Sequence, residues 1–348
     1  MKHNNVLKGV LYLIRLSILD QSPIPNGHTH TEAIRNTVKL VRHAEQLGYH
    51  RFWVSEHHDS NRLAGSSPEV LMAHLAAITS NIRIGSGGVL LPHYSPYKVA
   101  EWFRTLEVLY PGRVDLGLGR APGGIPIATR ALQEHKHKTV DMYPELISDL
   151  IGYLHDSHGP DHRFAGLTAN PVADTSPEMW LLGSSEGSAE IAAEQGTSFV
   201  FAQFINGDGG VEAVKRYRKN FRPSAVQTAP NSAVAIHLIC ARTEEEANTI
   251  ASSLDLSLLF MSLGVRFPGI PSIEQAQHYN YTPYDLEIIR SNRRRMVVGS
   301  PDQVKRKLLE LSEAYESEEF IVITITHQLE HKLTSYELLA EQFNIVTN

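Results

Sequence analysis

Cysteine is almost absent from this sequence, because only one of its 348 residues, Cys240, is a cysteine. A single cysteine cannot form a disulfide within the chain, and it cannot supply a cysteine-based metal site. Cys240 lies in an apolar run, so we expect a buried, inert thiol in a protein of a reducing compartment.

The chain also lacks long hydrophobic runs and any excess of positive charge. The apolar stretch at residues 6–19 is interrupted by Lys8 and Arg15 and is too short to cross a bilayer. We therefore predict a short lead-in over residues 1–14, a single domain over residues 15–348 and a cytoplasmic location. With 32 Lys and Arg against 38 Asp and Glu, the net charge of −6 argues against a nucleic-acid or membrane partner and favours a small-molecule substrate.

A dinucleotide-binding fingerprint is missing as well. Gly117 and Gly119 have the first spacing of that motif, but Pro122 stands where the third glycine should be. No matching strand–helix–strand unit surrounds them, so the sequence does not predict a Rossmann fold.

What the sequence does contain is a regular alternation of strand-like and helix-like segments. Such an alternation is typical of an α/β protein with a parallel sheet. The predicted strands cover residues 16–19, 51–55, 82–85, 114–118, 179–182, 198–202, 233–240 and 320–325, and predicted helices include 31–47, 68–79, 96–109, 141–154, 188–195 and 335–343. Further helices are expected to begin at Thr243 and Ser300, whereas residues 155–176 and 254–295 look irregular. Eight strands with the longest insertions after strands four and seven predict a (β/α)8 TIM barrel.

Active sites of such barrels lie where the strands end, so the residues that follow each strand are the candidates for chemistry. They are Asp20, Gln21, Glu56, His57, His58, Ser86, Gly87, Gly88, Arg120, Gly183, Ser184, Ser185, Gln203, Arg242, Thr326 and His327.

The fourth strand ends in a cation, Arg120, within Gly117-Leu-Gly-Arg120. The glycines leave room for a bulky group against the backbone, and a guanidinium can hold a carboxylate or phosphate through two parallel hydrogen bonds. The alternative is a tight barrel corner whose arginine makes only a surface ion pair.

The segment Leu181-Leu-Gly183-Ser184-Ser185-Glu-Gly-Ser188 reads as a strand, a glycine turn and a helix start. Free N–H groups at a helix start and three hydroxyls suit an anion such as phosphate, with Arg120 as counter-charge. Helix capping by Ser185 without any ligand is the alternative.

Two further strand ends carry distinctive residues. Glu56-His57-His58 follows an apolar strand, so an imidazole is available as a general acid or base, although two adjacent histidines cannot both face the pocket. A structural hydrogen bond is the alternative. Ser86, Gly87 and Gly88 could admit a flat ring system beside the barrel axis, or could form a glycine bulge that binds nothing.

In order and spacing these segments resemble the bacterial-luciferase-like flavin-dependent monooxygenases, in particular the single-subunit branch without an assigned substrate. The resemblance extends from about residue 15 over nearly the whole chain. It rests on Leu16-Ser-Ile-Leu-Asp-Gln-Ser-Pro23, Phe52-Trp-Val-Ser-Glu-His-His58, Ile82-Arg-Ile-Gly-Ser-Gly-Gly88, Gly112-Arg-Val-Asp-Leu-Gly-Leu-Gly-Arg120, Leu182-Gly-Ser-Ser185 and Ile325-Thr-His327.

The resemblance implies an FMN cofactor at the carboxyl ends of the strands. Arg120 with Gly183, Ser184, Ser185 and Ser188 would bind its phosphate, and the Ser86–Gly87 peptide, often a cis bond in the family, would lie behind the flavin ring. His57 matches the histidine near the reactive edge of the ring, and Gln203 is a candidate for its pyrimidine side.

The resemblance further implies that reduced FMN reacts with O₂ to give a C4a-hydroperoxide, which oxidises a small, hydrophobic organic substrate. His57 would stabilise or protonate that species, and residues 155–176 and 254–295 would be lids. A homodimer, and a separate flavin reductase unless NAD(P)H is used directly, are family expectations. The light-emitting subunits carry a cysteine at the position of Gly119, so we do not predict light emission.

Three alternatives stay open. One is an F420-dependent oxidoreductase of the same fold, and another is a flavin-binding protein without turnover. A metal-dependent barrel hydrolase could use His28, His30, His57 and His58, but strands five and six end in Gly-Ser and Ala-Gln, which leaves too few metal ligands.

Overall fold

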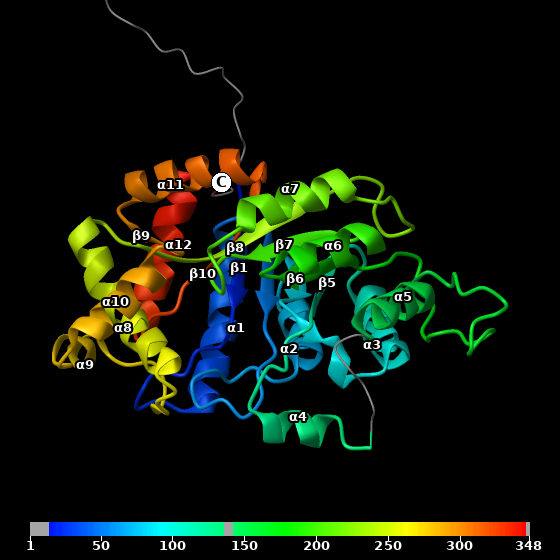
Figure 1. Ribbon diagram of the computed structural model, residues 1–348, viewed down its shortest axis with the longest axis horizontal. Coiled ribbons are helices and arrows are strands. Elements are labelled where there is room, and N and C mark those ends of the chain that lie inside the picture. Colours follow the sequence, from blue (N-terminus) through cyan, green and yellow to red (C-terminus); the bar gives the residue numbers. More distant parts are fainter. Residues whose placement is uncertain (1–13, 136–141, 346–348) are drawn as a thin grey trace, which may run out of the picture.

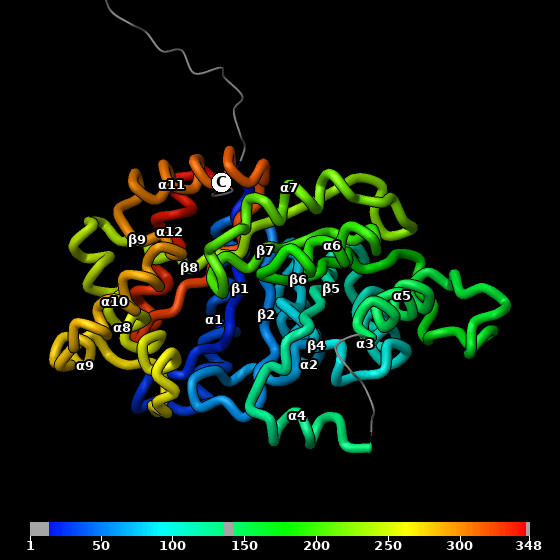
Figure 2. Tube along the Cα trace, in the orientation of Figure 1, coloured from blue at the N-terminus to red at the C-terminus, as the bar shows by residue number. Residues whose placement is uncertain are grey.

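The computed structural model describes residues 14–135 and 142–345, and its centre is a closed barrel of eight parallel strands (Figures 1 and 2). The last strand pairs with both the first and the seventh strand and so closes the barrel. The staves are β1 (Arg15–Asp20), β2 (Arg51–Val54), β3 (Arg83–Ser86), β5 (Val114–Gly119), β6 (Glu178–Gly183), β7 (Ser198–Ala202), β8 (Ser232–Cys240) and β10 (Glu319–Ile323). The predicted TIM barrel is confirmed. The predicted lead-in, apart from Ile14, and the helix start predicted at Asp141 lie outside the described residues.

Two short strands extend the barrel beyond this ring. β4 (Val89–Leu90) pairs with Leu118 and Gly119 at the end of β5, after β3 has paired with the start of β5. β9 (Met296–Gly299) likewise pairs with the second half of β8, where the pairing with β7 has stopped. Neither short strand was predicted, because each is at most four residues long and gives almost no periodic signal.

The predicted helices are present, together with others. The helices are α1 (His30–Gln46), α2 (Pro68–Ala77), α3 (Pro96–Leu109), α4 (Pro126–Leu132), α5 (Tyr143–Leu154), α6 (Glu186–Gln195), α7 (Gly210–Asn220), α8 (Glu244–Ser262), α9 (Ile273–Gln277), α10 (Pro283–Arg293), α11 (Pro301–Tyr315) and α12 (Leu329–Gln342). Of these, α4, α7, α9 and α10 are additional helices that the sequence reasoning did not identify. Segment 254–295 is therefore mostly helical, and its prediction as irregular was wrong. The Pro, Tyr and Arg residues that suggested irregularity include Pro283, which occupies the first turn of α10, where proline is tolerated.

The starts of the helices are the features that the sequence indicates most directly. α1 begins after Thr29, whose hydroxyl accepts a hydrogen bond from the Glu32 backbone N–H at 3.2 Å, while the Glu32 carboxylate accepts one from the Thr29 N–H at 2.7 Å. This reciprocal capping box places the start of the helix at His30, one residue before the predicted start.

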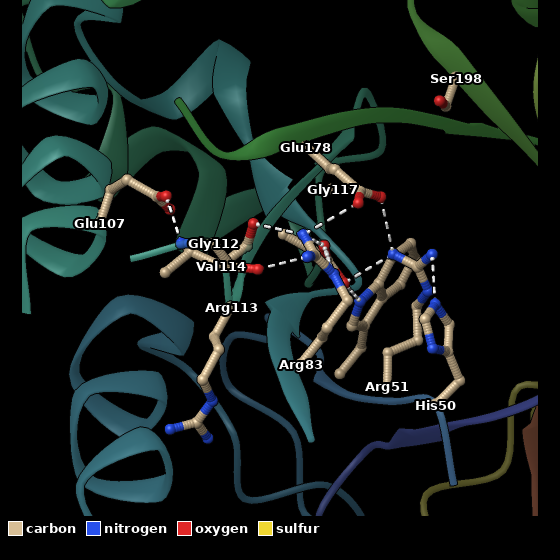
Figure 3. A network of polar contacts seen from close by, with 12 residues as sticks. His50, Arg51, Arg83, Glu107, Gly112, Arg113, Val114, Gly117, Glu178 and Ser198 are labelled. Atoms are coloured by element: carbon tan, nitrogen blue, oxygen red, sulfur yellow. Dashed lines mark hydrogen bonds and ion pairs between the residues drawn. The ribbon is translucent and has the colours of Figure 1, made fainter. Parts of the chain in front are cut away.

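The base of the barrel, at the amino ends of the strands, is closed by charged side chains, of which Arg51, Asp115 and Glu319 are buried. Arg51, Arg83, Asp115, Glu178 and Glu319 each occupy the first or second position of their strand, and we call them the barrel-base network. Arg51 donates hydrogen bonds to Asp115 at 2.8 Å and to Glu319 at 2.7 Å, and Arg83 donates to Asp115 at 2.6 Å. Figure 3 shows Arg51 and Arg83 directed toward Glu178.

Tryptophans form the next layer of the barrel interior. The rings of Trp53 and Trp180 meet edge to face at 5.8 Å, and the Arg51 guanidinium lies 4.8 Å from the Trp180 ring centroid. Trp53 also donates a hydrogen bond to Asp115 at 2.8 Å. Charged and aromatic side chains therefore occupy the lower half of the barrel, and the carboxyl ends of the strands are the expected place for a ligand.

The two segments expected to be lids lie on different sides of the barrel. Residues 155–176 join α5 to the start of β6, where Thr175 donates to Glu107 at 2.6 Å near the end of α3, and Tyr97 of α3 donates to the Thr168 carbonyl. In Figure 1 this segment projects outward beyond α5, at the edge of the molecule. Its contacts are with the outer helix α3, so its prediction as a lid was wrong.

The second insertion does reach the carboxyl ends. Ile270 exchanges backbone hydrogen bonds with Ile24 and Asn26 in the loop after β1, and Asn61 in the loop after β2 donates to the Phe267 carbonyl at 2.9 Å. Residues 254–295 therefore cover the strand ends on the side of β1 and β2.

The glycines of β3 and β5 provide a test of how closely these strands pack. A Cβ at Gly117 would lie 2.1 Å from the Ser86 carbonyl oxygen, so Gly117→Ala is expected to lower the free energy of unfolding by about 1–3 kcal/mol. Chemical denaturation measures this loss. The matched control is Gly187→Ala on α6, where nothing lies within 4 Å and helix propensity predicts a gain of up to about 1 kcal/mol. Equal behaviour of the two variants would contradict the packing argument.

Candidate active site at the carboxyl ends of the strands

His57 lies in the loop after β2 and is held by two hydrogen bonds. Its backbone N–H donates to the Gly65 carbonyl at 2.8 Å, and its Nδ1 lies 3.1 Å from the Ser55 hydroxyl. Among the described residues, no hydrogen bond engages its Nε2. Burial, together with the nearby His58 and Arg62, lowers the pKa of His57 to about 4. The ring is therefore neutral at physiological pH, with one nitrogen fixed and the other available.

Glu56 is a buried carboxylate at the same strand end, to which sequence reasoning gave no specific role. Its buried carboxylate accepts hydrogen bonds from Tyr94 at 2.7 Å, from the Leu90 backbone N–H at 2.9 Å and from His58 Nε2 at 2.8 Å. These contacts tie the loop after β2 to β4 and direct the His58 ring to Glu56. An acidic residue directly after an apolar strand was the signal that could have identified it.

The Ser86 side chain is fully buried, and its hydroxyl forms hydrogen bonds with β5. Its hydroxyl donates to the Gly117 carbonyl at 2.8 Å and accepts from the Gly117 N–H at 3.0 Å. The cis peptide bond joins Gly87 and Gly88, one residue later than the expected Ser86–Gly87 bond. A Cβ at Gly87 would lie 2.7 Å from Leu19 and 3.2 Å from Trp53, so part of the space left by the glycines is filled by the barrel interior.

Arg120 follows β5 and has no hydrogen bond or ion pair with any residue of the described ranges. It lies close enough to Tyr143 of α5 to oppose, through its charge, the rise in the pKa of that phenol caused by burial. The Tyr143 hydroxyl is buried and makes no hydrogen bond within the described part of the chain. Tyr143 was missed by sequence reasoning, since it gave only a helical signal. Within the described residues, a cation without a partner thus lies near a hydroxyl without a partner, and both are donors that an anion could use.

The neighbouring strand end carries the predicted serines. β6 ends at Gly183, and α6 begins at Glu186 after Ser185, whose hydroxyl accepts from the Ser188 N–H at 3.3 Å and lies 3.1 Å from the Ser188 hydroxyl. Ser185 is thus the helix cap that the alternative interpretation expected. Ser184 is half-buried, and its carbonyl accepts from Asn206 at 3.3 Å. A Cβ at Gly183 would collide with Ser188 at 2.1 Å, so glycine is required for this turn.

Strand register brings Arg120 and the serines together. Leu118 of β5 pairs with Leu181 of β6, so Arg120 and Ser184 follow adjacent strands at similar height. His57 follows β2, which is separated from β5 only by β3. The sequence-predicted residues therefore converge at one end of the barrel, as the barrel rule requires.

Gln203 follows β7 and is 6% exposed. Its side-chain oxygen is fully buried and lacks a hydrogen-bond partner among the described residues. An unsatisfied buried acceptor costs free energy unless a ligand supplies the donor. Gly183 of β6 pairs with Phe201 of β7, so Gln203 lies at the same end of the barrel as the serines.

Comparisons with known proteins decide the family. Residues 14–317 match the family model described as "Luciferase-like monooxygenase". The chain belongs to this family. It is 54% identical over 331 residues to the Bacillus subtilis protein YwcH, covering 95% of this chain and 99% of that protein. It is 42% identical over 336 residues to the N-acetyl-S-alkylcysteine monooxygenase of the same organism, covering 94% and 98% of the two chains.

Solved structures of luciferase-like proteins share the fold. The crystal structure of apo-MsnO8 matches with a TM-score of 0.87 and 38% identity, over 95% of this chain and 99% of that one. At 20% identity, the oxygenating constituent of 3,6-diketocamphane monooxygenase from Pseudomonas putida, in complex with FMN, matches with a TM-score of 0.69 over 94% and 98% of the chains. An F420-dependent secondary alcohol dehydrogenase matches at 14% identity with a TM-score of 0.67, over 96% and 99%. The last two show only that the fold is shared.

Membership of the luciferase-like monooxygenase family makes this chain an oxidoreductase and displaces the hydrolase alternative. His28 and His30, which that alternative would have used, are exposed just before and at the start of α1. Within residues 14–135 and 142–345, no three His, Cys, Asp or Glu side chains are grouped closely enough to hold a metal ion. In the same ranges no helix has both the length and the apolar composition to span a bilayer.

Acid is expected to destabilise this monooxygenase through buried histidines. Burial lowers the pKa of His237 in β8 to about 4, against an unfolded value near 6.5, as it does for His57. The unfolded chain therefore binds more protons between these values, so stability falls as pH decreases through that window. Because of His237 alone, the free energy of unfolding should fall by roughly 2 kcal/mol between pH 6.5 and pH 5.

Thermal unfolding measured at pH 7.5, 6 and 5 checks this prediction. His237→Gln should flatten the pH dependence, whereas His30→Gln at the exposed start of α1 should not change it. A pH profile that is the same in all three proteins would refute it.

Proposed function

We propose that this protein is a flavin-dependent monooxygenase that uses reduced FMN and O₂ to oxidise a small organic molecule. The observation that carries the proposal is the Arg120 guanidinium, which pairs with no residue of ranges 14–135 and 142–345 and lies beside the serine-lined turn of β6, at the open end of a luciferase-like barrel. A half-exposed cation follows one strand and a helix begins after the neighbouring strand, and this arrangement suits the phosphate of a mononucleotide.

The residues present fit FMN in three places. Arg120, Gly183, Ser184, Ser185 and Ser188 would hold the phosphate. The backbone at Ser86 and Gly87 would lie behind the ring, since the Ser86 side chain is engaged with Gly117. The unsatisfied oxygen of Gln203 would accept a hydrogen bond from a ring N–H.

Reduced FMN, when bound, supplies the electrons that activate O₂, by the oxygen-activating route that the resemblance implies. His57 would act at the reacting edge, because its neutral ring can donate or accept one proton at Nε2 while Ser55 holds Nδ1. Residues 254–295 would exclude water from the carboxyl ends of β1 and β2, which favours transfer of oxygen to substrate over release of peroxide.

F420 is the second candidate cofactor, favoured by the fold shared with an F420-dependent dehydrogenase. The cytoplasmic location, the homodimer, the single domain over residues 15–348 and the separate flavin reductase stay predictions. As a first test substrate we propose an N-acetyl-S-alkylcysteine, the compound class named for the relative that is 42% identical.

Anaerobic titration with reduced FMN and with reduced F420 tests the cofactor, and admission of oxygen with the thioether probe tests the reaction. We expect FMN to bind with the higher affinity, and we expect its affinity to fall by about tenfold to a hundredfold in Arg120→Gln, the loss of one charge-assisted contact. Tighter binding of F420, or equal FMN binding by Arg120→Gln, would refute the assignment.

A further inference from the structure

Arg62 is a half-buried cation at the mouth of the barrel that forms no ion pair with any residue of ranges 14–135 and 142–345. It lies in the loop after β2, the loop that also carries His57, and the Ile24 N–H donates to its backbone carbonyl at 2.8 Å. Its guanidinium makes two long hydrogen bonds, both from Nη1, to the carbonyl of Ser257 at 3.3 Å and to its hydroxyl at 3.4 Å. Its Nε and Nη2 have no partner in the described part of the chain.

This arrangement is unusual among the well-buried cations of the molecule. Arg51, Arg83, Arg104, Arg293 and Lys332 each pair with a carboxylate at 3.2 Å or less. Arg113 has no carboxylate, but it uses its donors on the carbonyls of Ala76, Thr79 and Ile82 and on the Thr79 hydroxyl. Arg295 is half-buried and also lacks a carboxylate, but its two Nη atoms donate to the Ile205 carbonyl and to Asn292. At the strand ends, within the described residues, Arg62, Arg120 and the exposed Arg242 keep unused side-chain donors, and Arg62 is the one in the loop that carries His57.

Among the residues that the structure describes, no carboxylate is available to pair with Arg62. Asp255, the acidic residue of α8 nearest in sequence to Ser257, is held by Arg293 through two hydrogen bonds of 2.7 Å. Asp59, in the same loop as Arg62, is exposed and forms no ion pair with it. Partial burial lowers the pKa of Arg62, as expected for a guanidinium that lacks a counter-charge.

Arg62 also lies near the proposed reaction centre. Its charge contributes to lowering the pKa of His57, which places the guanidinium within electrostatic range of the imidazole. The contacts with Ser257 and between Asn61 and Phe267 put it where the loop after β2 meets residues 254–295. Arg120 is already assigned to the cofactor phosphate and follows a different strand.

We propose that Arg62 binds a carboxylate of the organic substrate, so that the protein selects acidic substrates over neutral ones. A carboxylate can accept two parallel hydrogen bonds from the unused Nε and Nη2. Held there, an acid would present the rest of its chain to His57 and the flavin. This inference rests on the proposed function, and it adds the substrate class.

Binding measurements test the proposal without turnover. Calorimetry with the FMN-loaded protein and with the FMN-free protein would compare N-acetyl-S-methylcysteine, phenylacetate and hexanoate, each with its primary amide. We expect at least one acid to bind about tenfold to a hundredfold more tightly than its amide. Arg62→Gln should abolish that preference, and Arg62→Lys should restore part of it.

Two controls separate this proposal from the others. Arg306→Gln removes the same charge from an exposed site on α11 and should keep the preference for acids. FMN affinity should fall in Arg120→Gln but stay unchanged in Arg62→Gln, and thermal unfolding verifies that each variant is folded.

Any of three results would overturn the proposal: no acid preferred over its amide by the unsubstituted protein, the preference retained in Arg62→Gln, or loss of FMN affinity in Arg62→Gln equal to that in Arg120→Gln. Failure of the unsubstituted protein to bind FMN would instead refute the proposed function, and the comparison of acids with amides in the FMN-free protein would still decide the role of Arg62.

Discussion

Replacement of Arg51 by alanine is expected to lower the free energy of unfolding by about 3–5 kcal/mol, or the melting temperature by about 10 °C. Arg51 is 2% exposed and bridges Asp115 and Glu319, which are themselves buried. When Arg51 is removed, Glu319 keeps a hydrogen bond from the Ser17 hydroxyl at 2.6 Å and a long contact of 3.6 Å with the exposed Arg15. An uncompensated buried carboxylate is among the most costly defects that one substitution can create.

Two further variants test the cause of this loss. Arg15→Ala removes a half-exposed cation 3.6 Å from the same carboxylate and should cost at most about 1 kcal/mol. The double variant Arg51→Met with Glu319→Met should be more stable than Arg51→Ala, because the unpaired charge is then removed with its partner. Equal losses in Arg51→Ala and Arg15→Ala, measured by urea unfolding, would contradict the role of the barrel-base network.

Replacement of His57 by alanine is expected to reduce formation of oxidised product by roughly 10²- to 10⁴-fold, the usual contribution of a general acid or base. The Nε2 of His57 is the unengaged ring nitrogen at the end of β2, and Arg120, which would hold the phosphate, follows another strand. FMN affinity should therefore be unchanged, and oxygen uptake should yield hydrogen peroxide in place of product.

Product and peroxide are measured with the thioether probe and reduced FMN. His58→Gln is the matched control, because the His58 ring contacts Glu56 and glutamine can keep a hydrogen bond to that carboxylate. It should change product yield far less than His57→Ala. Unchanged turnover in His57→Ala would favour the structural role for His57, and loss of FMN binding would move His57 from the reaction to the cofactor site.

The sequence predicted the barrel because its strands are buried on both faces and its helix starts carry explicit caps. It also predicted which residues follow each strand, and register alone then brings Arg120 and Ser184 to adjacent positions. It could not predict the roles of Glu56 and Tyr143, since these depend on Leu90, Tyr94 and Arg120, contacts that arise only when distant loops meet.

The errors have equally physical causes. The position of residues 155–176 was misjudged because a break in periodicity does not show at which end of the barrel a loop lies. Only its place between a helix and the start of the next strand decides that. The cis bond was expected one residue early because Ser86 is a regular strand residue whose hydroxyl bonds to Gly117, and the chain turns only after it.

The ion pairs and tryptophans in the lower half of the barrel leave the carboxyl ends of the strands as the side from which a ligand is expected to enter. Under the proposed function, cofactor, oxygen and organic molecule would share that side. A molecule that still occupies it would block the next one, so release of a bound molecule would limit how often the site is refilled.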